Sequence, residues 1–139
     1  MKMITLEDIK KIGLWISNKG RKLEEYRWKY HFGKGAKDDI LKELKKYQND
    51  DGGFGKGLNP DCLTNASSPL VTAMACKILY EIGCTESNDI IEAALQYFEK
   101  NHFDENTCTW STVIKENNNA PHGTWWHFDE YGNNTWGFN

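Results

Sequence analysis

Two residues of the sequence, Asp61 and His122, have side chains that suit proton transfer near neutral pH. A histidine gains and loses its proton in this range, and an aspartate can serve as its partner or as a general base. Polar neighbours that could help to bind a ligand, Asn59, Ser67 and Ser68, flank Asp61. The alternative is that Ser68 only caps a helix. The predicted catalytic residues are Asp61 and His122, with Asn59 and Ser68 as predicted ligand-binding residues.

Tryptophans make up the second group of candidate site residues. Four of the six lie after residue 100, and Trp125 and Trp126 are adjacent. Aromatic faces can line an apolar or sugar-binding pocket, or stabilise a cation. We therefore predict that Trp110, Trp125 and Trp126 contribute to ligand binding, with simple packing as the alternative. The stretch 101–139 is rich in Asn and is expected to form loops and turns, apart from a short helix over 111–115.

Residue types that bind zinc also occur in the second half of the chain. Asp104, Cys108 and either His122 or His127 supply a carboxylate, a thiolate and an imidazole. We favour a structural role for these residues over a shared metal ion, so we predict neither a metal site nor a cofactor. None of the four cysteines belongs to a Cys-x-x-Cys pair, and free thiols in a cytosolic protein are the expected state.

Helices must position these residues, and the sequence predicts five of them. Each has apolar residues at helical spacing together with a start or stop signal, such as Thr5 before the first helix or Ser68-Pro69 before the fourth. Asp38-Asp39 is expected to cap the third helix, and Ser87 or Asn88 the fifth. The expected ranges are 5–20, 21–32, 38–48, 70–82 and 89–100. The fourth segment is apolar on nearly every side, so it should be buried on most sides.

Two of the expected helices match each other at an offset of 51 residues. The matched pairs are Asp38 with Asp89, Ile40 with Ile91, Leu44 with Leu95, and Tyr47 with Phe98. Each helix is followed by a turn and then by an aromatic residue, and Pro69 has a counterpart in Pro121. Such a period predicts stacked helix pairs, in which amphipathic outer helices alternate with apolar inner helices.

The segment 44–55, with Gln48, Gly52, Gly53 and Phe54, resembles the Gln…Gly-Trp repeat of squalene cyclases and the repeats of protein prenyltransferase β subunits. The segments 57–72 and 120–126 are similar to an uncharacterised bacterial group of toroid proteins. The resemblance covers about residues 38–128, and its second repeat is degenerate. It implies an all-α fold of the α/α-toroid type, with antiparallel helix pairs and Gly-rich connecting turns. Gln48 should bond to backbone groups of the adjacent turn, and the repeat aromatic should pack between helix pairs.

The resemblance also implies a function, which is binding of an apolar or isoprenoid-like ligand in an aromatic cavity. The loops that carry Asp61 and His122 would then face one mouth of the toroid. The clustered Asp-x-Asp-Asp acid of the cyclases is absent from the sequence, and Asp38-Asp39 lacks the third carboxylate of a magnesium motif. These motifs therefore do not support catalysis, and whether the protein is an enzyme stays open. Two alternatives are a toroid that binds or cleaves sugar polymers and a purely structural or interaction segment.

Charge, hydropathy and length narrow the choice of partners. Net charge is -3, with about +5 in residues 1–50 and about -8 in the remainder. Basic and aromatic residues alternate over 27–32, for which we favour a packed helix over a nucleic-acid surface. No apolar run approaches about 18 residues, so we expect neither a membrane span nor a secretory signal. The expected location is therefore cytoplasmic.

At about 50 residues per repeat, the 139 residues supply two and a half repeats of one partial toroid domain. This predicts self-association or a missing C-terminal half.

Overall fold

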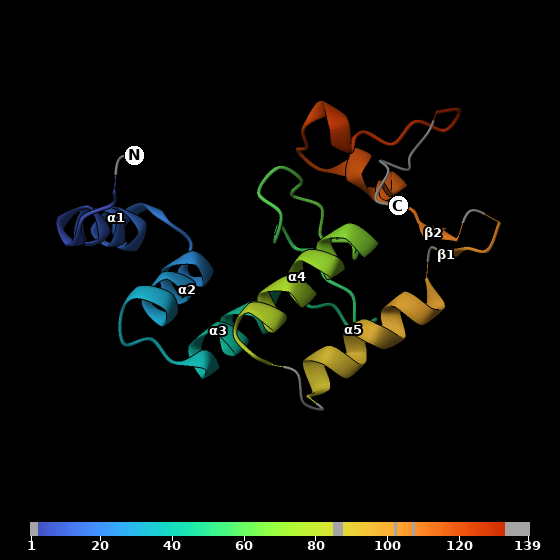
Figure 1. The fold of residues 1–139 in the computed structure, drawn as a ribbon. Helices are drawn as coiled ribbons and strands as arrows, with labels where there is room; N and C mark the ends of the chain where they lie inside the picture. Colours follow the sequence, from blue (N-terminus) through green and yellow to red (C-terminus); the bar gives the residue numbers. More distant parts are fainter. Residues whose placement is uncertain (1–2, 85–87, 102, 107, 133–139) are drawn as a thin grey trace. The chain divides into compact units, whose positions relative to one another are not determined.

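The computed structural model describes residues 3–84, 88–101, 103–106 and 108–132 of the chain. Its described part is mainly helical, with one small antiparallel sheet (Figure 1). The elements are α1 (Leu6–Lys19), α2 (Lys22–Phe32), α3 (Lys37–Leu44), η1 (Lys45–Tyr47), α4 (Pro69–Glu81), α5 (Asp89–Lys100), β1 (Phe103–Asp104), β2 (Thr109–Trp110), η2 (Lys115–Asn119) and η3 (Thr124–Trp126), where η marks a 3-10 helix. The chain divides into two compact units, Met1–Lys46 and Tyr47–Asn139.

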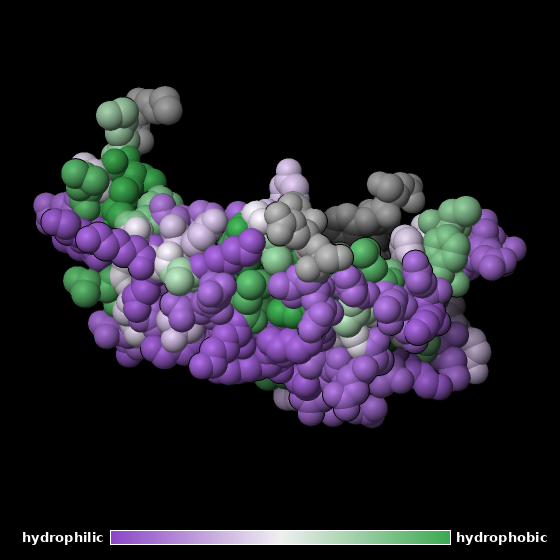
Figure 2. Space-filling view, turned by 90° about the horizontal axis from the view of Figure 1, so that it is seen from below, coloured by the Kyte–Doolittle hydropathy of each residue, from purple (hydrophilic) through white to green (hydrophobic). Residues whose placement is uncertain are grey.

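In the first unit, helix α1 begins and ends where its sequence predicts. The Thr5 hydroxyl accepts a hydrogen bond from the Asp8 amide, and the Asp8 carboxylate accepts one from the Thr5 amide, which makes a capping box. None of the residues of α1 is buried, although α1 packs against α2. Figure 2 shows apolar residues gathered over α1. The exposed ones in and before α1 are Met3, Ile4, Leu6, Ile12, Leu14 and Trp15. Self-association of the chain stays a prediction.

Helix α2 contains the alternating basic and aromatic residues, and it is a packed helix, as the sequence analysis favours. The rings of Trp28 and Phe32, four residues apart, have centroids 4.3 Å from each other. The buried Glu25 carboxylate accepts hydrogen bonds from Lys22 and Lys29, each 2.6 Å long. These two ammonium groups lower the pKa of Glu25 to about 2.

The prediction for the start and end of helix α3 is wrong. The helix begins at Lys37 with Ala36 as its N-cap residue, so Asp38 and Asp39 lie inside the first turn instead of capping it. There the two carboxylates still stabilise the helix, because they lie near the positive end of its dipole. The α-helix ends at Leu44 and continues only as the 3-10 turn η1, so it does not reach Gln48.

In the second unit, side chains cap both long helices as predicted. The Ser68 hydroxyl accepts a hydrogen bond from the Val71 amide, and Pro69 occupies the first turn of α4. The Asn88 side chain accepts one from the Ile90 amide at the start of α5, while Ser87 lies outside the described residues. Gly83 follows α4 with a φ of 65°, a left-handed conformation that favours glycine.

Helix α5 does not bury the residues that the offset of 51 matches with the preceding repeat. Its buried residues are Ile90, Ala94 and Tyr97, whereas Leu95 is 54% exposed. Ile90, Ala94 and Tyr97 follow Ile40, Leu44 and Tyr47 by 50 residues (90 − 40, 94 − 44 and 97 − 47). The offset of 51 matches the buried Ile40 with the partly buried Ile91, and the buried Leu44 with the exposed Leu95, because one residue along a helix rotates the face by about 100°.

The Gly-rich turn after η1 packs against α5, and Gln48 holds it as predicted. The Gln48 side-chain amide donates to the carbonyl oxygens of Gly52 at 2.9 Å and Ile90 at 3.0 Å. Gly52 has a φ of 88°, and a Cβ at this position would lie 2.2 Å from the Ala93 carbonyl oxygen. The ring of Phe54 is fully buried, and its amide donates to the Thr72 hydroxyl of α4. The repeat residues of this turn are thus structural.

After α5 the chain forms a short hairpin instead of the predicted loop. Phe103 pairs with Trp110, and Asp104 with Thr109. Cys108, at the turn, has a φ of 52° and an exposed side chain. The helix predicted over 111–115 is wrong. That segment is non-helical, since Thr112, Val113 and Ile114 are β-branched and buried, and the 3-10 helix η2 starts only at Lys115.

Candidate functional site

The best candidate for a ligand site is an apolar pocket in the second unit, with a volume of about 450 Å³. One stripe of α4 forms its first wall, with side chains at the spacing i, i+3, i+4 and i+7, which places them on one helix face. This face of α4 stays open, although nearly the whole helix is apolar. The lining residues are Pro69, Leu70, Ala73, Met74, Lys77, Phe98, Trp110 and Thr112.

Trp110 of β2 forms part of the second wall, and three contacts fix its ring. Its indole nitrogen donates to the carbonyl oxygen of Phe98 at 3.0 Å. Its ring meets that of Phe98 edge-on, with centroids 5.5 Å apart, and lies 4.8 Å from the ring of Phe103, its partner across the hairpin. The hairpin and the last turns of α5 therefore present the ring in one orientation. Trp110 thus has the place in a pocket that its predicted role requires.

Among the described residues that line this pocket, Lys77 is the one cation. Its side chain is exposed, and no carboxylate of the described residues forms an ion pair with it. The pocket thus combines an apolar wall, two aromatic rings and one positive charge. Sequence reasoning missed Lys77 and Phe98 as site residues. The signal available for Lys77 was its position on the stripe 70, 73, 74 and 77 of an otherwise apolar helix.

The loops that carry Asp61 and His122 lie side by side, as the sequence analysis expects. The Gly123 amide donates to the Asp61 carbonyl oxygen, and the Leu63 amide to the Pro121 carbonyl oxygen, each at 2.9 Å. These two hydrogen bonds belong to an isolated antiparallel β-bridge, in which Cys62 lies opposite His122. Neighbouring residues of extended chain point to opposite sides, so the bridge directs the side chain of Cys62, and not that of Asp61, toward the His122 side.

The two predicted catalytic side chains do not contact each other in the described part of the structure. The exposed Asp61 carboxylate has no hydrogen bond to a described residue, and the His122 ring bonds to Ala120 and His127. The thiol of Cys62 is buried, which raises its pKa and keeps it neutral. An acid–base pair of Asp61 and His122 stays a prediction that these contacts do not support.

Asn59 and Ser68 form hydrogen bonds within the protein that stabilise its local structure. The Asn59 side-chain oxygen accepts from the Asp61 amide at 3.0 Å, which makes a tight turn, and the residue is buried. Ser68 caps α4, its amide donates to the Phe54 carbonyl oxygen, and its own carbonyl oxygen accepts from the Thr72 hydroxyl. Neither residue lines the apolar pocket. Their ligand-binding role stays a prediction.

The adjacent Trp125 and Trp126 have different surroundings. Trp126 is 6% exposed, and its backbone carbonyl accepts a hydrogen bond from the Asn117 side chain at 3.0 Å. Trp125 is 54% exposed and covers Gly123, where an added Cβ would lie 2.8 Å from its ring. One ring therefore anchors the 3-10 segment in the core while the other lies on the surface. Only Trp110 of the three predicted tryptophans lines the apolar pocket.

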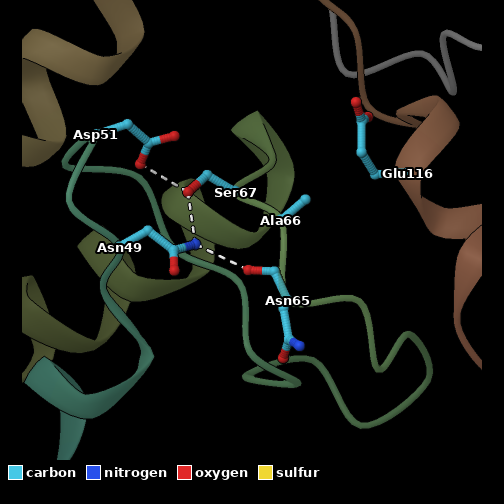
Figure 3. Close-up of a pocket in the computed structure, with 6 residues that line it drawn as sticks. All are labelled: Asn49, Asp51, Asn65, Ala66, Ser67 and Glu116. Atoms are coloured by element: carbon cyan, nitrogen blue, oxygen red, sulfur yellow. Dashed lines mark hydrogen bonds between the residues drawn. The ribbon is translucent and has the colours of Figure 1, made fainter.

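A second pocket, about 440 Å³ in volume, is polar (Figure 3). The Asp51 carboxylate accepts hydrogen bonds from the Ser67 hydroxyl at 2.8 Å and from the Gly53 amide at 2.9 Å. The Asn49 side-chain amide donates to the Ser67 hydroxyl and to the Asn65 carbonyl oxygen. These bonds hold the Gly-rich turn, so most of the polar groups around the pocket already have protein partners. The lining residues are Asn49, Asp51, Asn65, Ala66, Ser67 and Glu116.

The pKa of the Tyr97 phenol is raised in these surroundings. Burial raises its pKa well above the usual range, and the negative charges of Asp51 and Glu116 raise it further. The Tyr97 hydroxyl therefore stays neutral at all physiological pH values. Its ring lies against Gly53, where a Cβ would be 2.6 Å away. No aromatic face lies among the six described residues that line the polar pocket, and a sugar platform would need one.

The zinc-binding residue types do not converge. Among the described residues, no three side chains of His, Cys, Asp or Glu are grouped so as to hold a metal ion. Asp104 and Cys108 belong to the hairpin, whereas His122 and His127 flank η3. The described residues also include no helix with the length and apolar composition that a membrane crossing requires.

Comparison of the chain with known protein families, curated proteins and solved structures finds no match. The support for any statement on fold and function therefore comes from the contacts described above. The resemblance to squalene cyclases and prenyltransferases stays a sequence-based expectation.

Proposed function

We propose that the protein binds a small apolar ligand with an anionic group, of the isoprenoid diphosphate type, in the pocket between α4, Phe98 and Trp110. The observation that carries the proposal is the open apolar stripe of α4 facing a fixed Trp110 ring, with Lys77 at its end. A volume of about 450 Å³ lies in the range of sites for small organic molecules. Apolar walls with a few placed polar groups are typical of such sites.

The proposal extends to the fold. We propose that the second unit is a segment of an α/α toroid, in which α4 is an inner helix and its open stripe lines the cavity. Gln48, Gly52, Gly53 and Phe54 support this because they make the contacts that the cyclase-like repeat requires. The helix pairs would then be antiparallel, with Gly-rich connections. The motifs do not support catalysis, so binding alone is proposed.

Calorimetric titration with farnesyl diphosphate and farnesol tests the ligand class, because the two share one isoprenoid chain and differ in charge. Binding of the diphosphate is expected to be tighter. Lys77→Gln should weaken diphosphate binding about fivefold, since an exposed charge contact is worth up to about 1 kcal/mol, and should leave farnesol unaffected. Lys100→Gln, an exposed lysine at the end of α5, is the matched control and should change neither.

Two further variants test the pocket itself. Ala73→Gln places a polar side chain into the pocket at an exposed helix position, so it should abolish binding of both ligands while the helix stays folded. Trp125→Leu, at the exposed tryptophan outside the pocket, should have no effect. Equal affinity of Ala73→Gln and wild type would refute the location. Binding of a soluble oligosaccharide, with none of either isoprenoid, would refute the ligand class and favour the sugar-binding alternative.

A further inference from the structure

His122 and His127 form a pair of imidazoles that the apolar pocket does not use. Nε2 of His122 lies 3.2 Å from Nδ1 of His127, and the rings are close to parallel, with an angle of 19° between them. His122 is half-buried, and His127 is exposed on the other side of η3. The His122 ring is therefore partly enclosed by protein, whereas the His127 ring is accessible to solvent.

Contacts of the His122 ring leave one nitrogen available as a ligand. Nδ1 lies 2.6 Å from the Ala120 carbonyl oxygen, which can only accept a hydrogen bond, so Nδ1 carries the proton. Nε2 then has a lone pair, and it faces His127. A histidine that ligates a metal usually donates its other ring nitrogen to a carbonyl or carboxylate, which fixes the tautomer. His122 already has this arrangement.

The distance between the two nitrogens suits a shared ion. Metal–imidazole bonds are about 2.0–2.1 Å long, so two nitrogens 3.2 Å apart subtend an angle of about 100° at one ion. This angle lies between those of octahedral and tetrahedral coordination. In this hydrogen bond Nε2 of His122 accepts, so Nδ1 of His127 carries the proton. To bind the ion, the exposed His127 ring has to move this proton to its own Nε2 and turn so that the freed Nδ1 lone pair points at the ion.

The backbone that carries the pair is held on both sides. The amides of Trp126 and His127 donate to the carbonyl oxygens of Gly123 and Thr124, and Gly123 donates to Asp61 across the bridge. The buried Trp126 ring precedes His127 and anchors η3 in the core. Binding would therefore cost little ordering of the chain, since the backbone around the two ligands is already fixed.

We propose that His122 Nε2 and His127 Nδ1 chelate one divalent late first-row transition ion. Imidazole ligands suit zinc, copper, nickel and iron, whereas magnesium and calcium prefer oxygen ligands. Among the described residues no third His, Cys, Asp or Glu completes the group, so water fills the other positions. The site is independent of the apolar pocket, because neither histidine lines it.

Calorimetric titration of the tag-free full chain with Zn²⁺ and with Mg²⁺ tests the site. It is carried out in a Cys108→Ser background, since this exposed thiol would compete for zinc. One Zn²⁺ per chain is expected, and no Mg²⁺. Removal of the group that hydrogen-bonds to a metal-binding histidine lowers metal affinity by about 10- to 100-fold. Removal of the histidine itself should lower it at least as much, so His127→Ala is expected to weaken zinc binding by about 100-fold. His31→Ala, at an exposed histidine of α2, is the matched control and should leave it unchanged.

A spectroscopic measurement distinguishes these ligands from others. Nitrogen-15 NMR of the imidazoles should show that zinc shifts Nε2 of His122 and Nδ1 of His127, while the nitrogens of His31 stay unchanged. His122→Ala would also remove the hydrogen bond to the Ala120 carbonyl oxygen, so His127→Ala, at an exposed position, decides the outcome. Zinc binding that is equally tight in His127→Ala, or shifts confined to other histidines, would overturn the proposal.

Discussion

Replacement of Gln48 by leucine removes the side-chain amide that joins the Gly-rich turn to α5, while keeping the volume of the side chain nearly constant. Gln48 is 6% exposed, and its amide nitrogen donates to the carbonyl oxygens of Gly52 and Ile90. The repeat assigns it a structural role. If that is correct, the substitution should change stability and leave ligand binding by the folded protein unaltered.

The size of the effect follows from the two carbonyl groups. The Ile90 oxygen lies in the first turn of α5 and also accepts the helical hydrogen bond from Ala94. It therefore keeps one partner in Gln48→Leu, and loss of the hydrogen bond from Gln48 should cost about 1 kcal/mol. The Gly52 oxygen has Gln48 as its side-chain donor in a buried turn, and a buried acceptor without a partner costs about 1–3 kcal/mol. We therefore expect Gln48→Leu to lower the free energy of unfolding of the second unit by about 2–4 kcal/mol.

Urea unfolding measures this difference, with amide hydrogen exchange of α4 and α5 reporting on the second unit alone. Gln96→Leu is the matched control because Gln96 is exposed on α5, and it should change stability by no more than about 0.5 kcal/mol. If Gln48→Leu proves as stable as Gln96→Leu, the two carbonyl groups do not depend on Gln48, and the structural role is refuted.

Two further predictions concern the turn after η1 and helix α2. Gly52→Ala should destabilise the second unit by about 3 kcal/mol or more, because the new Cβ would meet the Ala93 carbonyl oxygen at 2.2 Å and φ is positive. Gly83→Ala, where φ is positive but the space is open, should cost only about 1–2 kcal/mol in the same unfolding assay, and equal losses would contradict the steric argument. The lowered pKa of Glu25 should make its ion pairs stabilise the first unit fully above about pH 4.5, with this stabilisation lost as pH falls through about 2. A carboxyl titration by NMR with a midpoint near 4.5 would contradict this.

Local signals in the sequence predicted the helices well where a short-range interaction decides the boundary. Thr5, Ser68 and Asn88 cap helices through their own side chains, and Gln48 bonds within four residues of its own position. The start of α3 was missed because Asp38 and Asp39 are equally favourable in a first turn and at a cap. The helix expected over 111–115 fails because the burial of Thr112, Val113 and Ile114 outside a helix depends on distant packing.

The site was harder to predict, since it depends on which helix faces remain open. The composition of α4 indicates burial on most sides, and only the fold shows that Leu70, Ala73 and Met74 face a pocket. In the same way, the repeat offset of 51 matches Ile91, Leu95 and Phe98 with the preceding repeat, whereas packing buries Ile90, Ala94 and Tyr97 of α5. The neighbouring loops of Asp61 and His122 were correctly brought together, but the register of their bridge determines which side chains meet.

The turn of the hairpin gives the protein a natural labelling position. Of the four cysteines, Cys62 and Cys84 are buried, Cys76 is partly covered, and Cys108 is exposed at the hairpin turn. A maleimide dye should therefore react first at Cys108, two residues from Trp110 and hence beside the apolar pocket. Quenching of this dye by Trp110 would then report, in real time and without further engineering, when a ligand comes between the dye and the fixed ring.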